Sequence, residues 1–149
     1  MAYLLDTNLL LRWGNTVDPH HSLAQNAVLT LGTRAETLHL TGQNLVEFRN
    51  VATRPADYNG LGWSVADTET MASTFEAIFT LLADTPDVFP TWKRLAHDSG
   101  VIGKQVHDLR LVAVCHVHGV SYILTFNTGD FHRYAGLGPG LTVVHPGSV

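Results

Sequence analysis

Four carboxylates stand at places in the chain where a folded protein can bring acids together. Asp6 directly follows the apolar run Ala2–Leu5, Glu47 lies inside an apolar helix-like segment, Asp108 lies near the start of another, and Asp130 follows a third apolar run. Clustered carboxylates raise one another's pKa values unless a cation neutralises them. Carboxylate oxygens suit hard cations such as Mg²⁺ or Mn²⁺. Such a cluster would therefore persist with a bound divalent cation.

Each of these acids also has an ordinary structural explanation. Asp6 is a preferred residue type for capping the helix that follows it. Glu47 is four residues from Gln43, so both belong to one helix face that solvent would cover. Asp108 would interact favourably with a helix dipole, and Asp130 would be a common loop residue. These explanations stay open for each acid taken alone.

The apolar pattern predicts short strands alternating with helices, which favours a parallel sheet covered on both faces. The predicted strands are Ala2–Leu5, Thr37–Leu40, Tyr122–Thr125 and an edge strand at Thr142–Val144. The predicted helices are Leu9–Trp13, His20–Leu31, Gln43–Thr53, a helix opened by Ser64 with an apolar stripe from Met71 to Leu82, Asp87–His97 and Gln105–His118. Residues 125–130 are expected to form a loop.

This arrangement would bring the four acids to one edge of the sheet. Loops that follow parallel strands lie at the carboxyl edge, which is where open α/β sheets bind ligands. Asp6 and Asp130 follow strands, Asp108 begins the helix that leads into the second of those strands, and Glu47 lies on the helix after Thr37–Leu40. The four carboxylates are therefore expected to converge over one crevice.

Composition excludes several other classes of protein. A length of 149 residues suits a single domain, 1–149. The 13 acids against 9 bases argue against a broad basic face for nucleic acid, and setting the four candidate acids aside leaves 9 against 9. The single cysteine, Cys115, excludes an internal disulfide and a four-thiolate zinc site, and it fits the reducing cytoplasm. No apolar run reaches 18 residues, so no membrane span is expected.

The residues around these acids also resemble a known family. The stretches that carry the resemblance are Tyr3-Leu-Leu-Asp-Thr-Asn-Leu-Leu, Asn44-Leu-Val-Glu-Phe, Val51-Ala-Thr-Arg-Pro, Asn59-Gly-Leu-Gly-Trp-Ser, Gly103-Lys-Gln-Val-His-Asp-Leu-Arg-Leu-Val-Ala and Ile123-Leu-Thr-Phe-Asn-Thr-Gly-Asp-Phe. Their order and spacing resemble the PIN-domain ribonucleases, and specifically the VapC-type toxins of toxin–antitoxin pairs. The resemblance implies a three-layer α/β/α sandwich around a mostly parallel sheet.

The resemblance further implies a Mg²⁺-dependent endoribonuclease, with Mn²⁺ as a substitute, which leaves 5′-phosphate and 3′-hydroxyl ends. Asp6, Glu47 and Asp108 match the family's metal-binding acids, and Thr125 matches a hydroxyl near the site. Many relatives carry an aspartate where this chain has Asn127, so we expect Asp130 to take the fourth position or Asn127 to fill it.

Four basic residues flank the acids in sequence and are candidates for contact with RNA phosphates. They are Arg12, Arg49, Lys104 and Arg110, and solvated surface charge is the alternative for each.

The resemblance also implies a cognate antitoxin, which places a basic side chain in the acidic crevice, and a homodimer of the toxin. Two alternatives to a toxin are a housekeeping RNA-processing nuclease with the same fold and an inert binding module. The intact set of acids argues against the inert module.

Overall fold

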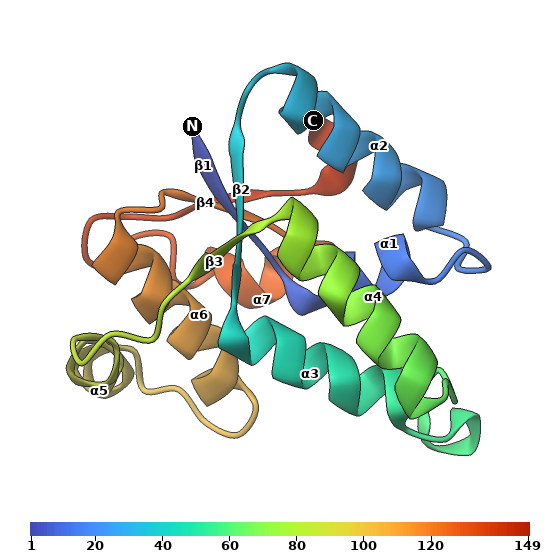
Figure 1. Cartoon of the computed structure of the whole chain (residues 1–149). Coiled ribbons are helices and arrows are strands. Elements are labelled where there is room, and N and C mark those ends of the chain that lie inside the picture. The colour runs from blue at the N-terminus through green and yellow to red at the C-terminus, as the bar shows by residue number, and fades with distance from the viewer.

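A computed structural model describes all of residues 1–149 and contains a five-stranded sheet in the order β3-β2-β1-β4-β5 (Figure 1). Every neighbouring pair of strands is parallel. The strands are β1 (Ala2–Leu5), β2 (Thr37–Thr41), β3 (Thr80–Leu82), β4 (Tyr122–Leu124) and β5 (Thr142–Val144). The predicted parallel sheet is thus confirmed, including β5 at an edge.

Helices cover both faces of this sheet and confirm the predicted three-layer α/β/α sandwich. The α-helices are α1 (Thr7–Gly14), α2 (His21–Thr33), α3 (Gly42–Thr53), α4 (Val65–Ile78), α5 (Val88–Ser99), α6 (Gln105–His118) and α7 (Thr128–His132). Short 3-10 helices occupy Ala56–Tyr58 and Pro146–Ser148. One apolar core joins the sheet to α1–α4, and a second joins it to α5–α7. Because side chains alternate along a strand, Leu5 belongs to the first core and Leu4 to the second.

The strand order changes direction at β1. The chain adds β2 and then β3 on one side of β1, and β4 and then β5 on the other. The register places Leu5 opposite Leu124, and the backbone N–H of Asp6 donates to the Leu124 carbonyl at 3.0 Å. Such a switch point leaves a crevice at the carboxyl ends of the strands. Asp6 therefore lies at the position that an α/β sheet offers to a ligand.

The sequence prediction was wrong about the end of α4. The helix ends at Ile78, Phe79 adopts extended backbone angles, and Thr80–Leu82 pairs with β2 as the edge strand β3. The apolar stripe that suggested a helix up to Leu82 continues across this change because Phe79 and Leu82 are both buried, in different cores. The expected loop at residues 125–130 also holds the start of the short helix α7.

A capping box fixes the start of α3. The hydroxyl of Thr41, the last residue of β2, accepts from the Asn44 backbone N–H at 3.1 Å, and the Asn44 side-chain oxygen accepts from the Thr41 N–H at 2.9 Å. Both residues are fully buried. This reciprocal pair sets the direction in which α3 leaves the sheet, and with it the place of Glu47.

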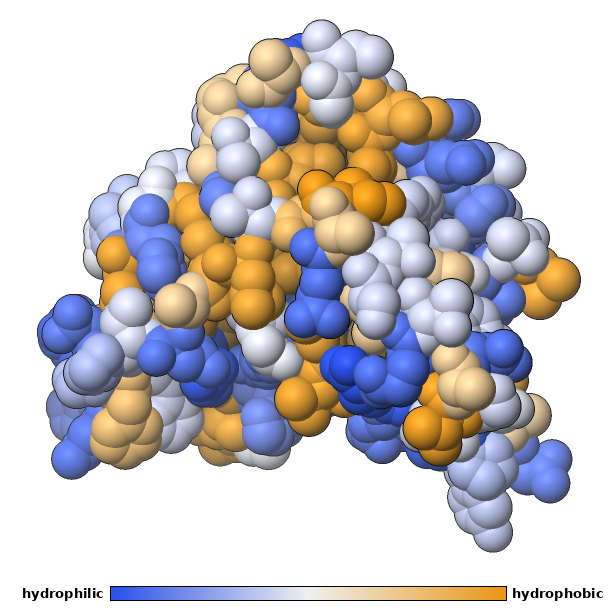
Figure 2. Space-filling view, in the orientation of Figure 1, coloured by the Kyte–Doolittle hydropathy of each residue, from blue (hydrophilic) through white to orange (hydrophobic).

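One face of the molecule carries an apolar groove of about 570 Å³ between α2, β2 and the C-terminal end of α4 (Figure 2). Leu29 and Ile78 are its exposed apolar residues. None of the helices is both long and apolar enough to cross a membrane.

The capping box predicts a specific stability loss. Thr41→Val keeps the shape of the side chain but leaves the buried Asn44 backbone N–H without a partner, so the free energy of unfolding should fall by about 1–3 kcal/mol in urea denaturation. Thr53→Val is the matched control, since Thr53 is exposed at the other end of α3. Equal losses in the two variants would contradict the role assigned to the cap.

Candidate metal-dependent active site

The carboxylate of Asp6 is the most enclosed acid of the molecule, with 7% of the residue exposed. It caps α1 by accepting from the Thr7 backbone N–H at 2.7 Å, so the N-cap explanation is correct in itself. It also accepts from Asn8 Nδ2 at 2.8 Å and from Thr125 Oγ1 at 2.7 Å. Capping requires only the bond from Thr7; the bond from Asn8 adds a second donor from α1, and the bond from Thr125 holds the carboxylate against the end of β4.

The hydroxyl of Thr125 joins the ends of β1 and β4. Besides donating to Asp6, it accepts from Asn8 Nδ2 at 3.1 Å and from the Asn127 backbone N–H at 3.0 Å. Asn8 Oδ1 in turn accepts from the Phe126 N–H at 3.1 Å. Thr125 therefore lies beside Asp6, as its position in the motif predicted, and Asn8 is an additional residue of the site.

Glu47 extends the same network across α3. Its Oε2 accepts from Thr7 Oγ1 at 2.7 Å and its Oε1 from Gln43 Nε2 at 2.8 Å. Thr7 Oγ1 also accepts from Asn44 Nδ2 at 3.1 Å, so the cap of α3 and the carboxylate of Glu47 share one partner. The residue next to Asp6 in the sequence thus connects Asp6 with Glu47.

The acids interact electrostatically. Burial above all, followed by the negative charges of Asp108 and Glu47, raises the pKa of Asp6 to about 7, although its hydrogen bonds from Thr125 and Thr7 oppose this. Burial, followed by the charges of Asp130 and Glu47, raises the pKa of Asp108 to about 6. None of the four acids forms an ion pair with a basic residue. No ion pair therefore balances the negative charge of this cluster, and Lys104 and His107 offset it only partly at Asp108.

The four acids differ in exposure. Asp6 is buried, Glu47 and Asp108 are half-buried, and Asp130 is exposed on α7. Asn127, which precedes α7, is also exposed and makes no side-chain cap bond. The enclosed end of the cluster lies at β1 and the open end lies at α7.

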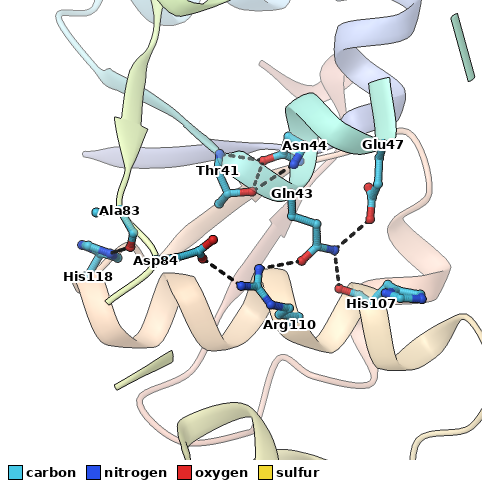
Figure 3. Close-up of polar contacts among 9 residues, drawn as sticks. All are labelled: Thr41, Gln43, Asn44, Glu47, Ala83, Asp84, His107, Arg110 and His118. Atoms are coloured by element: carbon cyan, nitrogen blue, oxygen red, sulfur yellow. Dashed lines mark hydrogen bonds and ion pairs between the residues drawn. The ribbon is translucent and has the colours of Figure 1, made fainter. Parts of the chain in front are cut away.

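A polar chain links α3 to α6 beside the cluster (Figure 3). Gln43 Nε2 donates to the His107 carbonyl at 2.9 Å as well as to Glu47, and Arg110 Nη1 donates to Gln43 Oε1 at 3.1 Å. Arg110 Nη2 donates to Asp84 at 2.9 Å. These residues line an open cleft of about 820 Å³, which adjoins the acid cluster through Glu47, the one acid common to both.

The predicted basic residues are distributed around this region. The positive charge of Lys104, at the start of α6, opposes the rise in the pKa of Asp108. The Arg12 guanidinium lies 4.3 Å from the ring centre of Phe126, next to Thr125. Arg110 lines the cleft and pairs there with Asp84 at 2.9 Å, whereas Arg49 forms an ion pair with Glu69 of α4 at 2.5 Å. Three of the four predicted cations thus adjoin site residues, and Arg49 is paired away from them.

The donor set suits a hard cation. Carboxylates that raise one another's pKa values and lack a basic partner are stabilised when a divalent ion neutralises them. As the side chains lie here, no three His, Cys, Asp or Glu residues converge closely enough to hold an ion. Both oxygens of Glu47 are engaged by Thr7 and Gln43. Binding of an ion would therefore require the acid side chains to move closer to one another.

Sequence reasoning missed several polar residues of the site, namely Thr7, Asn8, Gln43 and Asn44. Thr7 and Asn8 had a signal, since they directly follow Asp6. Gln43 also had one, since its spacing from Glu47 placed both on one helix face, and that face lines the cleft.

Comparison by sequence identifies the fold family. The model of the PIN domain matches residues 3–137. A search of curated proteins finds no match.

Comparison with solved structures finds the same architecture. The VapBC2 structure from Rickettsia felis, bound to a DNA fragment from its promoter, is similar with a TM-score of 0.68 and 16% identity, over 97% of this chain and 98% of that one. The structure of VapBC-1 from nontypeable Haemophilus influenzae is similar with a TM-score of 0.69 and 12% identity, over 98% of both chains. The structure of VapC20 from Mycobacterium tuberculosis, described as a Sarcin-Ricin loop cleaving toxin, is similar with a TM-score of 0.60 and 15% identity, over 81% of this chain and 86% of that one.

These structures share the fold at low sequence identity, and the family model covers most of the chain. The sequence resemblance is confirmed at this level: the chain belongs to the PIN domain family.

Proposed function

We propose that this protein is a Mg²⁺-dependent endoribonuclease, with Mn²⁺ as a substitute, and acts as the toxin of a toxin–antitoxin pair. The observation that carries the proposal is the repulsion among acids at the carboxyl edge of the sheet: in addition to burial, the charges of Asp108 and Glu47 raise the pKa of Asp6, and those of Asp130 and Glu47 raise the pKa of Asp108. Asp6 and Asp108 therefore destabilise the fold when they are ionised, so a ligand-free structural role accounts poorly for these two acids.

The comparisons support the substrate and partner classes. One structural neighbour is described as a toxin that cleaves the Sarcin-Ricin loop, and others as VapBC complexes or a toxin–antitoxin complex. RNA is therefore the substrate we propose, and a cognate antitoxin the partner. We also propose that the protein forms a homodimer and works in the cytoplasm.

The proposed division of labour follows the geometry. When bound, a divalent ion supplies charge neutralisation and activates water for attack on a phosphodiester. Asp6, Glu47 and Asp108 would hold it, and Asp130 or Asn127 would help to place a second ion or water. Thr125 and Asn8 orient the Asp6 carboxylate, since each donates to its Oδ2. Thr7 and Gln43 each hold one oxygen of Glu47.

Phosphate contacts would come from cations next to the cluster. Arg110 reaches the cleft with its guanidinium bonded to Gln43 and Asp84, and Lys104 lies beside Asp108. Arg12, on α1 with its guanidinium over the Phe126 ring, would contact the RNA on the other side of the cluster. Arg49 would have to leave Glu69 to take part.

Asp6→Asn and Asp108→Asn should each lower kcat/KM for RNA cleavage by about 100-fold or more, because each removes charge stabilisation of several kcal/mol. Cleavage of total RNA followed by gel electrophoresis measures this, with circular dichroism to check folding. Asp57→Asn, at an exposed acid in the 3-10 helix Ala56–Tyr58, is the matched control and should retain activity. Parental activity in Asp6→Asn would exclude the assigned site.

Metal binding should also be visible without catalysis. Adding Mg²⁺ or Mn²⁺ to EDTA-treated protein should raise the melting temperature in a concentration-dependent manner, because a ligand of the native state stabilises it. The shift should be lost in Asp6→Asn and kept in Asp57→Asn. An identical shift in all three proteins would indicate that the ion binds elsewhere.

The pKa of Asp6 predicts how metal-free stability depends on pH. Its ordinary value of 3.8 rises to about 7 on folding, so the native state binds the proton more tightly than the unfolded chain. The protonated Asp6 carboxyl therefore contributes its full stabilisation of the fold below about pH 4, and this contribution is lost as the pH rises through 7.

Asp108, whose pKa is raised to about 6, loses stabilisation in the same direction in both the parent and Asp6→Asn, whereas His39 and His116, whose pKa values are lowered by burial, act in the opposite direction in both. The test is therefore the difference between parent and variant in urea denaturation followed against pH in EDTA. Equal pH slopes in the two would show that the Asp6 carboxyl is ionised in the fold at neutral pH.

A further inference from the structure

Two aromatic rings lie side by side on the first turns of α5, one of them exposed and the other packed against the protein. Phe89 and Trp92 are three residues apart, so they share a helix face, and their rings are stacked with centres 5.8 Å apart at 24°. Phe89 is 65% exposed although it is a large apolar side chain. Trp92 is half-buried, and its indole N–H donates to the Val106 carbonyl at 2.8 Å. The pair is thus anchored on the α6 side and open on the Phe89 side.

These rings adjoin the cleft described above. Phe89, Trp92 and Val106 line a second hollow of about 310 Å³ together with His107 and Arg110. His107 and Arg110 also line the cleft that contains Glu47 (Figure 3). An extended ligand that passes over the acid cluster can therefore continue across His107 and Arg110 onto the rings.

The groups along this path differ in the part of a ligand that each can bind. The acid cluster suits cations, Arg110 and Lys104 suit phosphate, and the rings beyond offer an apolar π-face. A nucleic-acid strand has the same alternation of charged backbone and flat base. A base inside a duplex has both faces covered by its neighbours, so only an unpaired base has a free face to stack on a side chain.

We propose that Phe89 and Trp92 form a stacking platform for one unpaired nucleobase of the RNA substrate, close to the bond that is cut. The proposal depends on the proposed ribonuclease function and adds to it the side chains that hold an unpaired base beside the cleft. Phe89 contacts the base directly. Trp92 covers the inner side of the Phe89 ring, and Arg110 lies at the junction with the backbone path.

Binding to a protein that cannot cleave is the direct test. In the Asp6→Asn background, fluorescence anisotropy measures the Kd for a labelled single-stranded RNA and for a labelled RNA hairpin duplex. Loss of one base–aromatic contact corresponds to about 1–3 kcal/mol, so Phe89→Ala should weaken single-strand binding by about 5- to 150-fold. Duplex binding should change little.

Three further variants separate stacking from other effects. Phe89→Trp should retain binding because it keeps a π-face, and Phe89→Leu should lose it although it keeps apolar bulk. Leu29→Ala is the matched control, since Leu29 is 60% exposed and lies on α2. Single-strand affinity that is unchanged in Phe89→Ala, or kept in Phe89→Leu, would overturn the proposal.

Another protein chain is the competing occupant of the rings. Sedimentation of the same variants tests it, because a loss of RNA binding that coincides with dissociation of a dimer would assign the rings to protein contact and overturn the platform. Failure of the parent to cleave RNA, and of Asp6→Asn to bind it, would instead reject the ribonuclease function itself.

Discussion

The burial of one carboxylate at the end of the central strand is the constraint on which the site depends. Enclosing a charged group as deeply as Asp6 is enclosed costs several kcal/mol of folding free energy unless the group is hydrogen-bonded and neutralised. Hydrogen bonds from Thr7, Asn8 and Thr125 offset part of this cost and come from both segments that meet at the switch point. They fix the position of the carboxylate, but its pKa of about 7 shows that they do not fully compensate its charge.

The neighbouring elements are arranged around this acid. The Thr7 hydroxyl accepts from Asn44, which belongs to the cap of α3, and donates to the carboxylate of Glu47. The direction of α3 and the position of the second acid are therefore tied to the residue after Asp6. On the other side, Thr125 connects the acid to the start of the chain segment that carries Asp130. A small number of buried hydroxyl and amide groups thus holds side chains that are more than a hundred residues apart.

Local patterns in the sequence were sufficient to predict most of the strands and helices and to select the four acids as candidates. Short apolar runs followed by an acid or a hydroxyl located β1 and β4 with Asp6 and Thr125 at their ends, because buried parallel strands are apolar throughout. The strand β3 was missed because Phe79 and Leu82 fit a helical stripe as well as they fit two cores. Only pairing with β2 decides between these possibilities, and pairing is a property of the tertiary structure.

The polar connections of the site were beyond such patterns. Gln43 and Arg110 are 67 residues apart and meet only because α3 and α6 both begin at the carboxyl edge of the sheet, α3 directly after β2 and α6 one helix length before β4. The solvated face that Gln43 and Glu47 were expected to share exists, but a second helix faces it and turns it into a cleft. Sequence spacing indicates which side chains share a face, whereas the element opposite that face decides what the face can do.

The two outermost strands have a consequence for how other chains can bind. β3 and β5 are three residues long and each pairs on one side only, so the sheet offers very little free backbone at its borders. Extension of a sheet by a visiting strand depends on a row of such unpaired N–H and C=O groups. Association with this molecule therefore falls to helix surfaces and to the grooves between them, where side chains rather than backbone determine which chain is accepted.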